Sequence, residues 1–250
     1  MGQALRLERL RAELRVIVAG GKDPAAVLPF GLDALDSRLA GGGLADAGLD
    51  EAAGARGGYS DDAAATLFLA GIAGRRAGAR GTVLWAMARR DLFAPGLAQA
   101  GLPPDRLLVA EAGRDADVLA VMEEGLRHGA LAAVVGEVVR AGLTETRRLQ
   151  LAAEEGGTMA LLLRRWRQGD PLDQPSTALT RWRIGSAPSA PLPVAGIGRA
   201  RWHVELARQR GGPGFSLLLE ALDAQGRLAL PALSVHRPDQ ANGHDTRRAA

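Results

Sequence analysis

Residues 49–61 read Leu49-Asp50-Glu51-Ala52-Ala53-Gly54-Ala55-Arg56-Gly57-Gly58-Tyr59-Ser60-Asp61. The start of this stretch, residues 49–52, predicts a strand, and the glycines that follow predict a loop. Ser60 can cap a helix whose first turn carries Asp61 and Asp62, because a capping hydroxyl and acidic side chains both stabilise a helix N-terminus. The helix is expected to run to about Arg76, so the stretch predicts the first strand, loop and helix of the fold.

Strands and helices alternate after this unit. The expected strands are 82–86, 106–110, 132–136 and 158–163, and the expected helices are 92–100, 116–128 and 143–155. Asp91 is expected to cap the helix that starts at Leu92. Alternation of this kind predicts an α/β fold with a mostly parallel sheet and helices on both faces.

The pattern changes after Gln174-Pro175. Residues 178–184, 201–207 and 215–223 are β-like and have no long helices between them, which predicts antiparallel strands that extend one edge of the sheet. We expect an N-terminal helix over 1–22, a main domain over 23–233 with a β-rich extension over 174–233, and a polar, disordered tail over 234–250.

The loop at residues 54–61 resembles a phosphate-binding P-loop that has lost its chemistry. A P-loop reads G-x-x-x-x-G-K-[ST], in which the Lys meets the β/γ-phosphates and the hydroxyl holds Mg²⁺. Counting from Gly54, the chain has Tyr59, Ser60 and Asp61 at the Gly, Lys and Ser/Thr positions. Asp61 also places a carboxylate where phosphates would sit. We therefore expect a degenerate P-loop, no cofactor and no catalytic residues.

The composition excludes several classes of site. The 250 residues include no cysteine, one lysine (Lys22) and four widely spaced histidines, so neither a disulfide framework nor a metal site is expected. Arginines interrupt the apolar residues near the N-terminus, so no secretion signal is expected. Eighteen apolar residues never follow one another, so no membrane span is expected. These features predict a cytoplasmic protein without membrane contact.

Arginine is concentrated in residues 161–210, which hold nine Arg against three acidic residues. A surplus of this kind suits DNA or an acidic protein surface, and the candidate contacts are Arg165, Arg167, Arg181 and Arg183. Alternation along a strand separates Trp182 from Arg181 and Arg183. We therefore favour buried tryptophans with a free arginine face over aromatic stacking on bases.

An apolar stripe marks the N-terminal helix. Leu7, Leu10, Leu14 and Ile17 recur at helical spacing, and Gly20-Gly21 separates them from the main domain. The stripe either packs on the domain or enters a partner's groove, as amphipathic helices do in helix-in-groove recognition. We keep it as a candidate partner helix.

Several motifs together carry a family resemblance over about residues 4–233. They are Phe30-Gly31-Leu32-Asp33, Trp85 with 89–97, 122–128, 147–154, 163–167, 180–183 and 201–206. The first of these and the altered loop resemble the start of the RecA core. The whole series resembles the ImuA family, RecA-like accessory proteins of a damage-inducible mutasome.

The resemblance implies a RecA-like protein of the SOS response that acts in error-prone translesion synthesis without catalysis of its own. Its implied partners are ImuB and a DnaE-type error-prone polymerase, met directly or through ImuB. It transfers no catalytic residue, and it leaves open whether RecA or DNA is contacted. Two alternatives are a RecA-family ATPase or recombinase, which would bind nucleotide with Mg²⁺, and a SulA-like cell-division inhibitor, which would cause filamentation.

Overall fold

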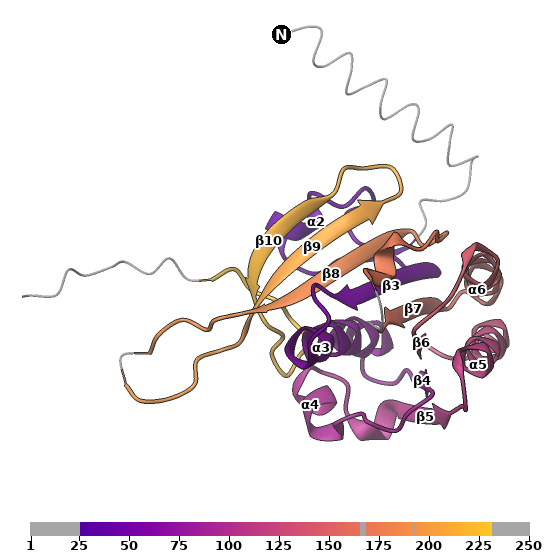
Figure 1. The fold of residues 1–250 in the computed structure, drawn as a ribbon, viewed down its shortest axis with the longest axis horizontal. Helices are drawn as coiled ribbons and strands as arrows, with labels where there is room; N and C mark the ends of the chain where they lie inside the picture. Colours follow the sequence, from indigo (N-terminus) through magenta and orange to yellow (C-terminus); the bar gives the residue numbers. More distant parts are fainter. Residues whose placement is uncertain (1–25, 166–168, 193, 232–250) are drawn as a thin grey trace, which may run out of the picture.

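The computed structural model describes residues 26–165, 169–192 and 194–231 (Figure 1). The predicted N-terminal helix with Leu7, Leu10, Leu14 and Ile17 lies outside these residues, as does the predicted tail over 234–250. The described residues form an eight-stranded sheet flanked by helices, so the expected mixed α/β class is confirmed.

The strand order of the sheet is β10-β9-β8-β3-β7-β6-β4-β5. Six strands are parallel: β3 (Gly48–Gly54), β4 (Val83–Met87), β5 (Leu107–Glu111), β6 (Ala133–Val138), β7 (Met159–Arg164) and β8 (Thr180–Ala187). β9 (Arg201–Gln209) and β10 (Phe215–Glu220) complete the sheet as antiparallel strands. A short two-stranded sheet, β1 (Val27–Leu28) with β2 (Leu44–Ala45), precedes it and encloses α2 (Asp33–Asp36).

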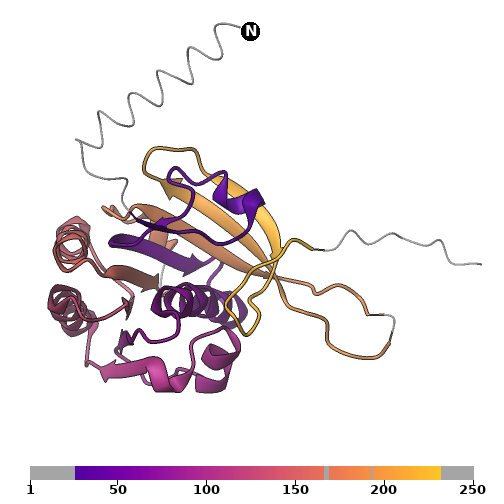
Figure 2. The same ribbon diagram turned by 180° about the vertical axis from the view of Figure 1, so that it is seen from behind.

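Helices cover both faces of the parallel part of the sheet, as the two opposite views show (Figures 1 and 2). α3 (Tyr59–Ala77) packs on one face beside α4 (Ala94–Gln99), and α5 (Asp115–His128) and α6 (Leu143–Gly156) pack on the other. Because side chains alternate along a strand, Ala52 contributes to the α3 core while Leu49 contributes to the α5/α6 core. The protein therefore has two hydrophobic cores, one on each face of the sheet.

The expectation of three antiparallel strands is wrong for the first of them. β8 runs parallel to β3, with Asp50 opposite Thr180 and Gly54 opposite Ile184. The chain leaves β7, crosses past β3 through a segment that contains a 3-10 turn at Pro171–Asp173, and enters β8 in the same direction. Only after β8 does it turn back on itself, through a long connection that projects from the body (Figure 1).

The start of α4 also differs from the expectation. α4 begins at Ala94 with Pro95 in its first turn, and Phe93, not Asp91, is the N-cap residue. Proline suits the first turn of a helix because no intrahelical partner is needed for its missing N–H. Asp91 therefore does not cap the helix; its carboxylate lies 3.2 Å from Arg89 Nη2.

Candidate functional site

The loop between β3 and α3 is held by its own strand neighbours. Asp61, buried at the start of α3, accepts hydrogen bonds from the Ser186 backbone N–H at 2.7 Å and the Ser186 hydroxyl at 2.8 Å. Gly54 packs so closely that a Cβ there would lie 3.0 Å from the Asp61 carbonyl carbon. The Asp61 carboxylate thus joins β8 to the N-terminus of α3.

The other residues of this loop point outward. The Tyr59 side chain is 95% exposed, and Ser60 is exposed as the second residue of α3. The expected Ser60 cap is wrong: Gly58 is the N-cap residue, and no side chain caps the helix. The four residues predicted for the altered P-loop therefore do come together, with Asp61 turned inward and Tyr59 outward.

A cleft opens beside this loop, at the carboxyl ends of β4 and β6 and against α3 and α4. It has a volume of about 360 Å³. In open α/β sheets this end of the strands is where ligands bind. We call it the strand-end cleft; its lining includes Tyr59, Asp62, Ala63, Thr66, Leu67, Ala88, Arg89, Asp91, Leu92, Phe93, Gly96, Leu97, Asp115, Glu137, Val138, Val139 and Arg165.

Glu137 forms the polar base of the strand-end cleft. Its Oε1 accepts a hydrogen bond from Trp85 Nε1 at 2.7 Å, and its Oε2 accepts two from Arg165, from Nε at 3.0 Å and Nη2 at 2.7 Å. The carboxylate is buried, and three donors satisfy most of its hydrogen-bonding capacity. Glu137 thus fastens the ends of β4, β6 and β7 to one another.

Asp62 lies in the same cleft with fewer internal contacts. Its Oδ1 is buried and has no hydrogen-bond partner, and its Oδ2 lies 3.8 Å from Arg165 Nη1, beyond hydrogen-bond distance. Burial raises the pKa of Asp62 above its ordinary value; Arg165 opposes this, and the nearby Asp61 and Asp91 add to it. Arg165 therefore compensates the charge of this carboxylate only in part.

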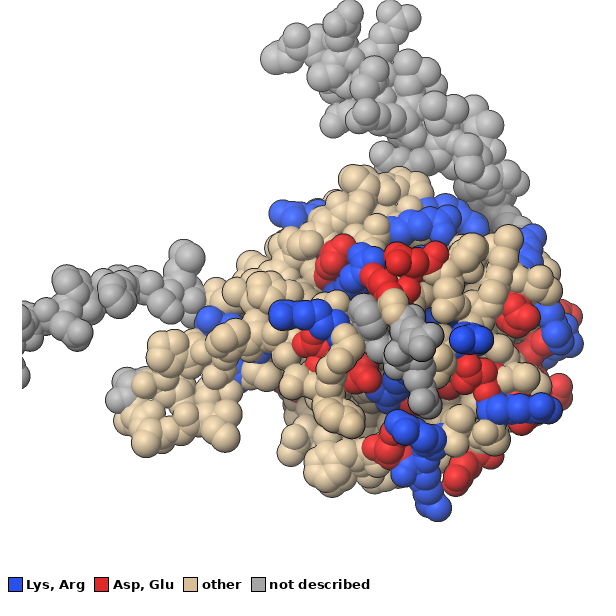
Figure 3. Space-filling model, in the orientation of Figure 1, with Lys and Arg blue, Asp and Glu red and all other residues tan. Residues whose placement is uncertain are grey.

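The charged lining of the cleft is acidic overall. Among the described lining residues, four carboxyl groups, Asp62, Asp91, Asp115 and Glu137, face two guanidinium groups, Arg89 and Arg165. With all of them ionised the lining has a net charge of −2. Acidic and basic side chains are also interspersed on the face of the molecule seen in Figure 3, with no continuous basic surface in view.

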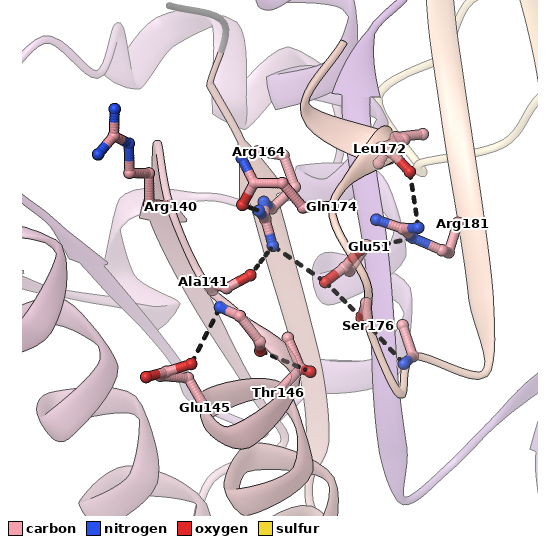
Figure 4. A network of polar contacts seen from close by, with 12 residues as sticks. Glu51, Arg140, Ala141, Glu145, Thr146, Arg164, Leu172, Gln174, Ser176 and Arg181 are labelled. Carbon is pink, nitrogen blue, oxygen red and sulfur yellow. Dashed lines mark hydrogen bonds and ion pairs between the residues drawn. The ribbon is translucent and has the colours of Figure 1, made fainter. Parts of the chain in front are cut away.

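A second polar cluster is fully buried beside β3 (Figure 4). Arg164 Nη1 lies 3.3 Å from Glu51 Oε1, and Arg181 Nε lies 2.8 Å from Glu51 Oε2. Ser176 donates to Glu51 at 2.8 Å, while Ala141 O and Leu172 O accept from Arg164 and Arg181. The cluster ties β3, β7 and β8 to the segment before β8; its enclosure gives it a structural role.

The arginines predicted to face DNA are mostly engaged inside the protein. Arg181 is buried against Glu51, which corrects the expectation of a free arginine face that includes it. Arg183 lies 2.6 Å from Asp170 Oδ2 and 3.0 Å from Glu205 Oε1, and Arg165 is paired with Glu137. Arg167 lies outside the described residues. DNA contact by these arginines stays a prediction.

The preferred placement of the strand tryptophans is confirmed. Trp182 and Trp202 are buried, and Trp182 packs against Phe30, Phe68 and Phe215 with ring centroids 5.5–6.2 Å apart. Trp182 Nε1 donates to Thr180 Oγ1 at 2.7 Å, which satisfies its only polar atom. These rings are core residues, so base stacking has no support from them.

Sequence reasoning missed the cleft residues Asp62, Glu137 and Trp85 as a group, although Glu137 directly follows an expected strand. The available signal was a carboxylate at the end of an apolar strand, since such a position either binds a ligand or needs a buried partner. Among the described residues, no grouping of His, Asp and Glu could hold a metal ion. No helix in the described ranges is long and apolar enough to cross a membrane.

Comparisons with known proteins identify relatives of the chain. No protein-family model matches it. Protein ImuA from two strains of Caulobacter vibrioides is 39% identical over 219 residues, which cover 82% of this chain and 88% of that protein. Among solved structures, SulA from Pseudomonas aeruginosa aligns with 47% of this chain and 98% of its own at 25% identity, with a TM-score of 0.39.

Proposed function

Because the chain belongs to the ImuA family, we propose that it is a non-catalytic accessory protein of SOS-induced, error-prone translesion DNA synthesis. In this role it acts in the cytoplasm through contacts with ImuB, and with a DnaE-type polymerase directly or through ImuB. The resemblance of its motifs to the family and the identity to the two Caulobacter proteins support this assignment.

The observation that carries the non-catalytic part is the state of the loop at the start of α3. We infer a RecA-like fold with a degenerate P-loop at Gly54, Tyr59, Ser60 and Asp61. The chain has no Lys in this loop, and Asp61 already bonds to Ser186. A helix N-terminus favours anions, and the carboxylate of Asp61, which belongs to the first turn of α3, would repel a phosphate bound there.

The acidity of the neighbouring strand-end cleft acts in the same direction. Phosphoryl transfer enzymes surround their phosphates with Lys, Arg and Mg²⁺. Here four carboxyl groups outnumber two guanidinium groups, and Arg165 is committed to Glu137. The negative charge of these carboxylates repels a nucleoside triphosphate, so binding of ATP is disfavoured by charge as well as by the missing lysine.

Thermal unfolding with Mg-ATP tests the non-catalytic proposal. A nucleotide present at a hundredfold excess over its dissociation constant would stabilise the protein by about 2.7 kcal/mol, and we expect no such stabilisation. A known ATPase in the same assay is the positive control. A saturable rise in melting temperature with Mg-ATP would favour the RecA-family ATPase alternative instead.

Deletion of the gene tests the role in mutagenesis. Cells without the protein should lose damage-induced mutations while spontaneous mutation stays at its basal rate, and the protein should co-purify with ImuB from damaged cells. Unchanged induced mutagenesis would refute the proposed role. Filamentation on overproduction without the mutasome partners would support the SulA-like alternative.

A further inference from the structure

The strand-end cleft has an apolar rim that is open to solvent. Phe93 at the start of α4 is 71% exposed, and Tyr59 at the start of α3 is 95% exposed. Leu67 and Leu92 also line the cleft. Exposed aromatic side chains beside a concave, partly apolar surface are typical of sites that bury them against a partner.

The interior of the same cleft is short of positive charge. Asp115 Oδ2 accepts from the backbone N–H groups of Val139 and Arg140, and both oxygens of Glu137 accept, from Trp85 and Arg165. Asp62 is less well compensated: its Oδ2 makes a 3.8 Å ion pair with Arg165, a guanidinium that already donates to Glu137, and its buried Oδ1 has no hydrogen-bond partner. An added cation near Asp62 would stabilise its charged form and offset part of the net negative charge of the lining.

We propose that the strand-end cleft binds a peptide segment of a protein partner, with a basic side chain directed to Asp62 and the flanking apolar side chains packed on Leu67, Leu92 and Phe93. The inference rests on the proposed role as an interaction subunit, and it specifies the chemistry of the partner segment. The cleft offers an apolar wall for affinity and a carboxylate for selection between basic and acidic sequences.

The dimensions and the charge of the cleft favour a peptide over other ligands. A volume of about 360 Å³ is near the lower end of the roughly 300–1,000 Å³ typical of ligand pockets, so it suits a few side chains. The carboxyl groups repel phosphates, which argues against a nucleotide or a nucleic acid. A small inorganic cation or a polyamine would leave the apolar side chains of the rim exposed to solvent.

A peptide selection on the full-length protein tests the inference. A phage library of random 12-residue peptides is selected on the immobilised protein, and enriched peptides are made with a fluorescent label for anisotropy. We expect enriched sequences to carry Arg or Lys between apolar residues, and replacement of that basic residue by Gln to weaken binding about tenfold. Acidic or purely polar enriched sequences, or no enrichment, would overturn the proposal.

Substitutions in the protein locate the site. Asp62→Asn and Phe93→Ser should each weaken the best peptide about tenfold. Leu143→Ser is the matched control for Phe93→Ser, because Leu143 is also exposed but lies at the start of α6, on the opposite face of the sheet. If Asp62→Asn fails to fold, as thermal unfolding would reveal, the exposed Asp91→Asn replaces it. Unchanged affinity in the cleft variants, or displacement of the peptide by Mg-ATP, would refute the proposal.

Mutagenesis in cells separates this inference from the proposed function. The wild-type gene should restore damage-induced mutation to a deletion strain, Leu143→Ser should restore it as well, and Phe93→Ser should not. If the deletion abolishes induced mutation and Phe93→Ser restores it fully, the cleft proposal fails while the proposed function stands. If the deletion has no effect, the proposed function fails, and the anisotropy measurements still decide whether the cleft binds basic peptides.

Discussion

Replacement of Asp50 by Asn should stabilise the protein at neutral and alkaline pH. Asp50 lies in the middle of the sheet on β3 and is fully buried. Thr180 Oγ1 donates to its Oδ1 at 2.6 Å, and its Oδ2 has no hydrogen-bond partner. Burial raises the pKa of Asp50 from its ordinary 3.8 to about 7, while the hydrogen bonds from Thr180 oppose this rise.

The sign and size of the effect follow from proton linkage. Between pH 3.8 and 7 the unfolded chain releases the Asp50 proton while the folded protein retains it, so the free energy of unfolding falls as pH rises. The difference of about three pKa units corresponds to roughly 4 kcal/mol, at about 1.4 kcal/mol per unit. Asn at position 50 keeps an oxygen for Thr180 but cannot ionise, so the variant escapes this loss.

Urea unfolding of both proteins from pH 4 to pH 9 measures the difference. Near pH 4 the two proteins should have similar free energies of unfolding. As the pH rises, the free energy of unfolding of the variant should exceed that of wild type by a growing amount, which reaches about 4 kcal/mol above pH 7. Asp105→Asn, at an exposed position in a 3-10 turn, is the control and should show no such trend. A difference between Asp50→Asn and wild type that does not change with pH would refute the reasoning.

Three further predictions concern the buried charges, the arginines and the N-terminal helix. Glu51→Gln should lower the free energy of unfolding by about 3–5 kcal/mol in urea titrations, because it leaves Arg164 and Arg181 buried without a counter-charge. Glu124→Gln, at an exposed position, is the control. Equal urea midpoints for Glu51→Gln and wild type would contradict the structural role. If Arg165, Arg167 and Arg183 hold DNA phosphates, their change to Ala should flatten the salt dependence of DNA affinity by about one unit per lost contact; an unchanged slope would show that they do not contact phosphates. Leu10→Ala with Leu14→Ala should remove co-purification with ImuB at an unchanged circular dichroism spectrum, since loss of an interface anchor costs about 2 kcal/mol or more; retained co-purification would place the interface elsewhere.

The arrangement of strands and helices was accessible from the sequence because it depends on local patterns. Apolar runs such as Thr82–Ala86 correspond to β4, and helical spacing over 143–155 corresponds to α6 almost residue for residue. The direction of β8 was not accessible in this way. It depends on whether the chain crosses past β3 before it enters β8, and a segment of similar length could return the chain in either direction.

The charge pattern was less informative than the hydrophobic pattern, because ion pairs join residues that are far apart in the chain. Glu51 bonds to Arg164 and Arg181, which are 113 and 130 residues away. The surplus of arginine counted over residues 161–210 is therefore offset by acidic residues outside that window, Glu51 and Glu137 among them. A local count of charge in the sequence thus overstates the positive charge available at the surface.

The strand-end cleft is a concavity whose polar groups are mostly paired inside the protein. The parallel strands still end beside the N-terminus of α3, which in an α/β sheet creates a concavity irrespective of what fills it. In this chain the polar groups at that point bond mainly to one another: Asp61 to Ser186, and Glu137 to Trp85 and Arg165. Asp62 differs, because its Oδ2 makes only a 3.8 Å ion pair with Arg165 and its buried Oδ1 has no hydrogen-bond partner. A concavity with a net acidic lining and an exposed aromatic rim has the properties needed to select a basic, apolar segment of another protein.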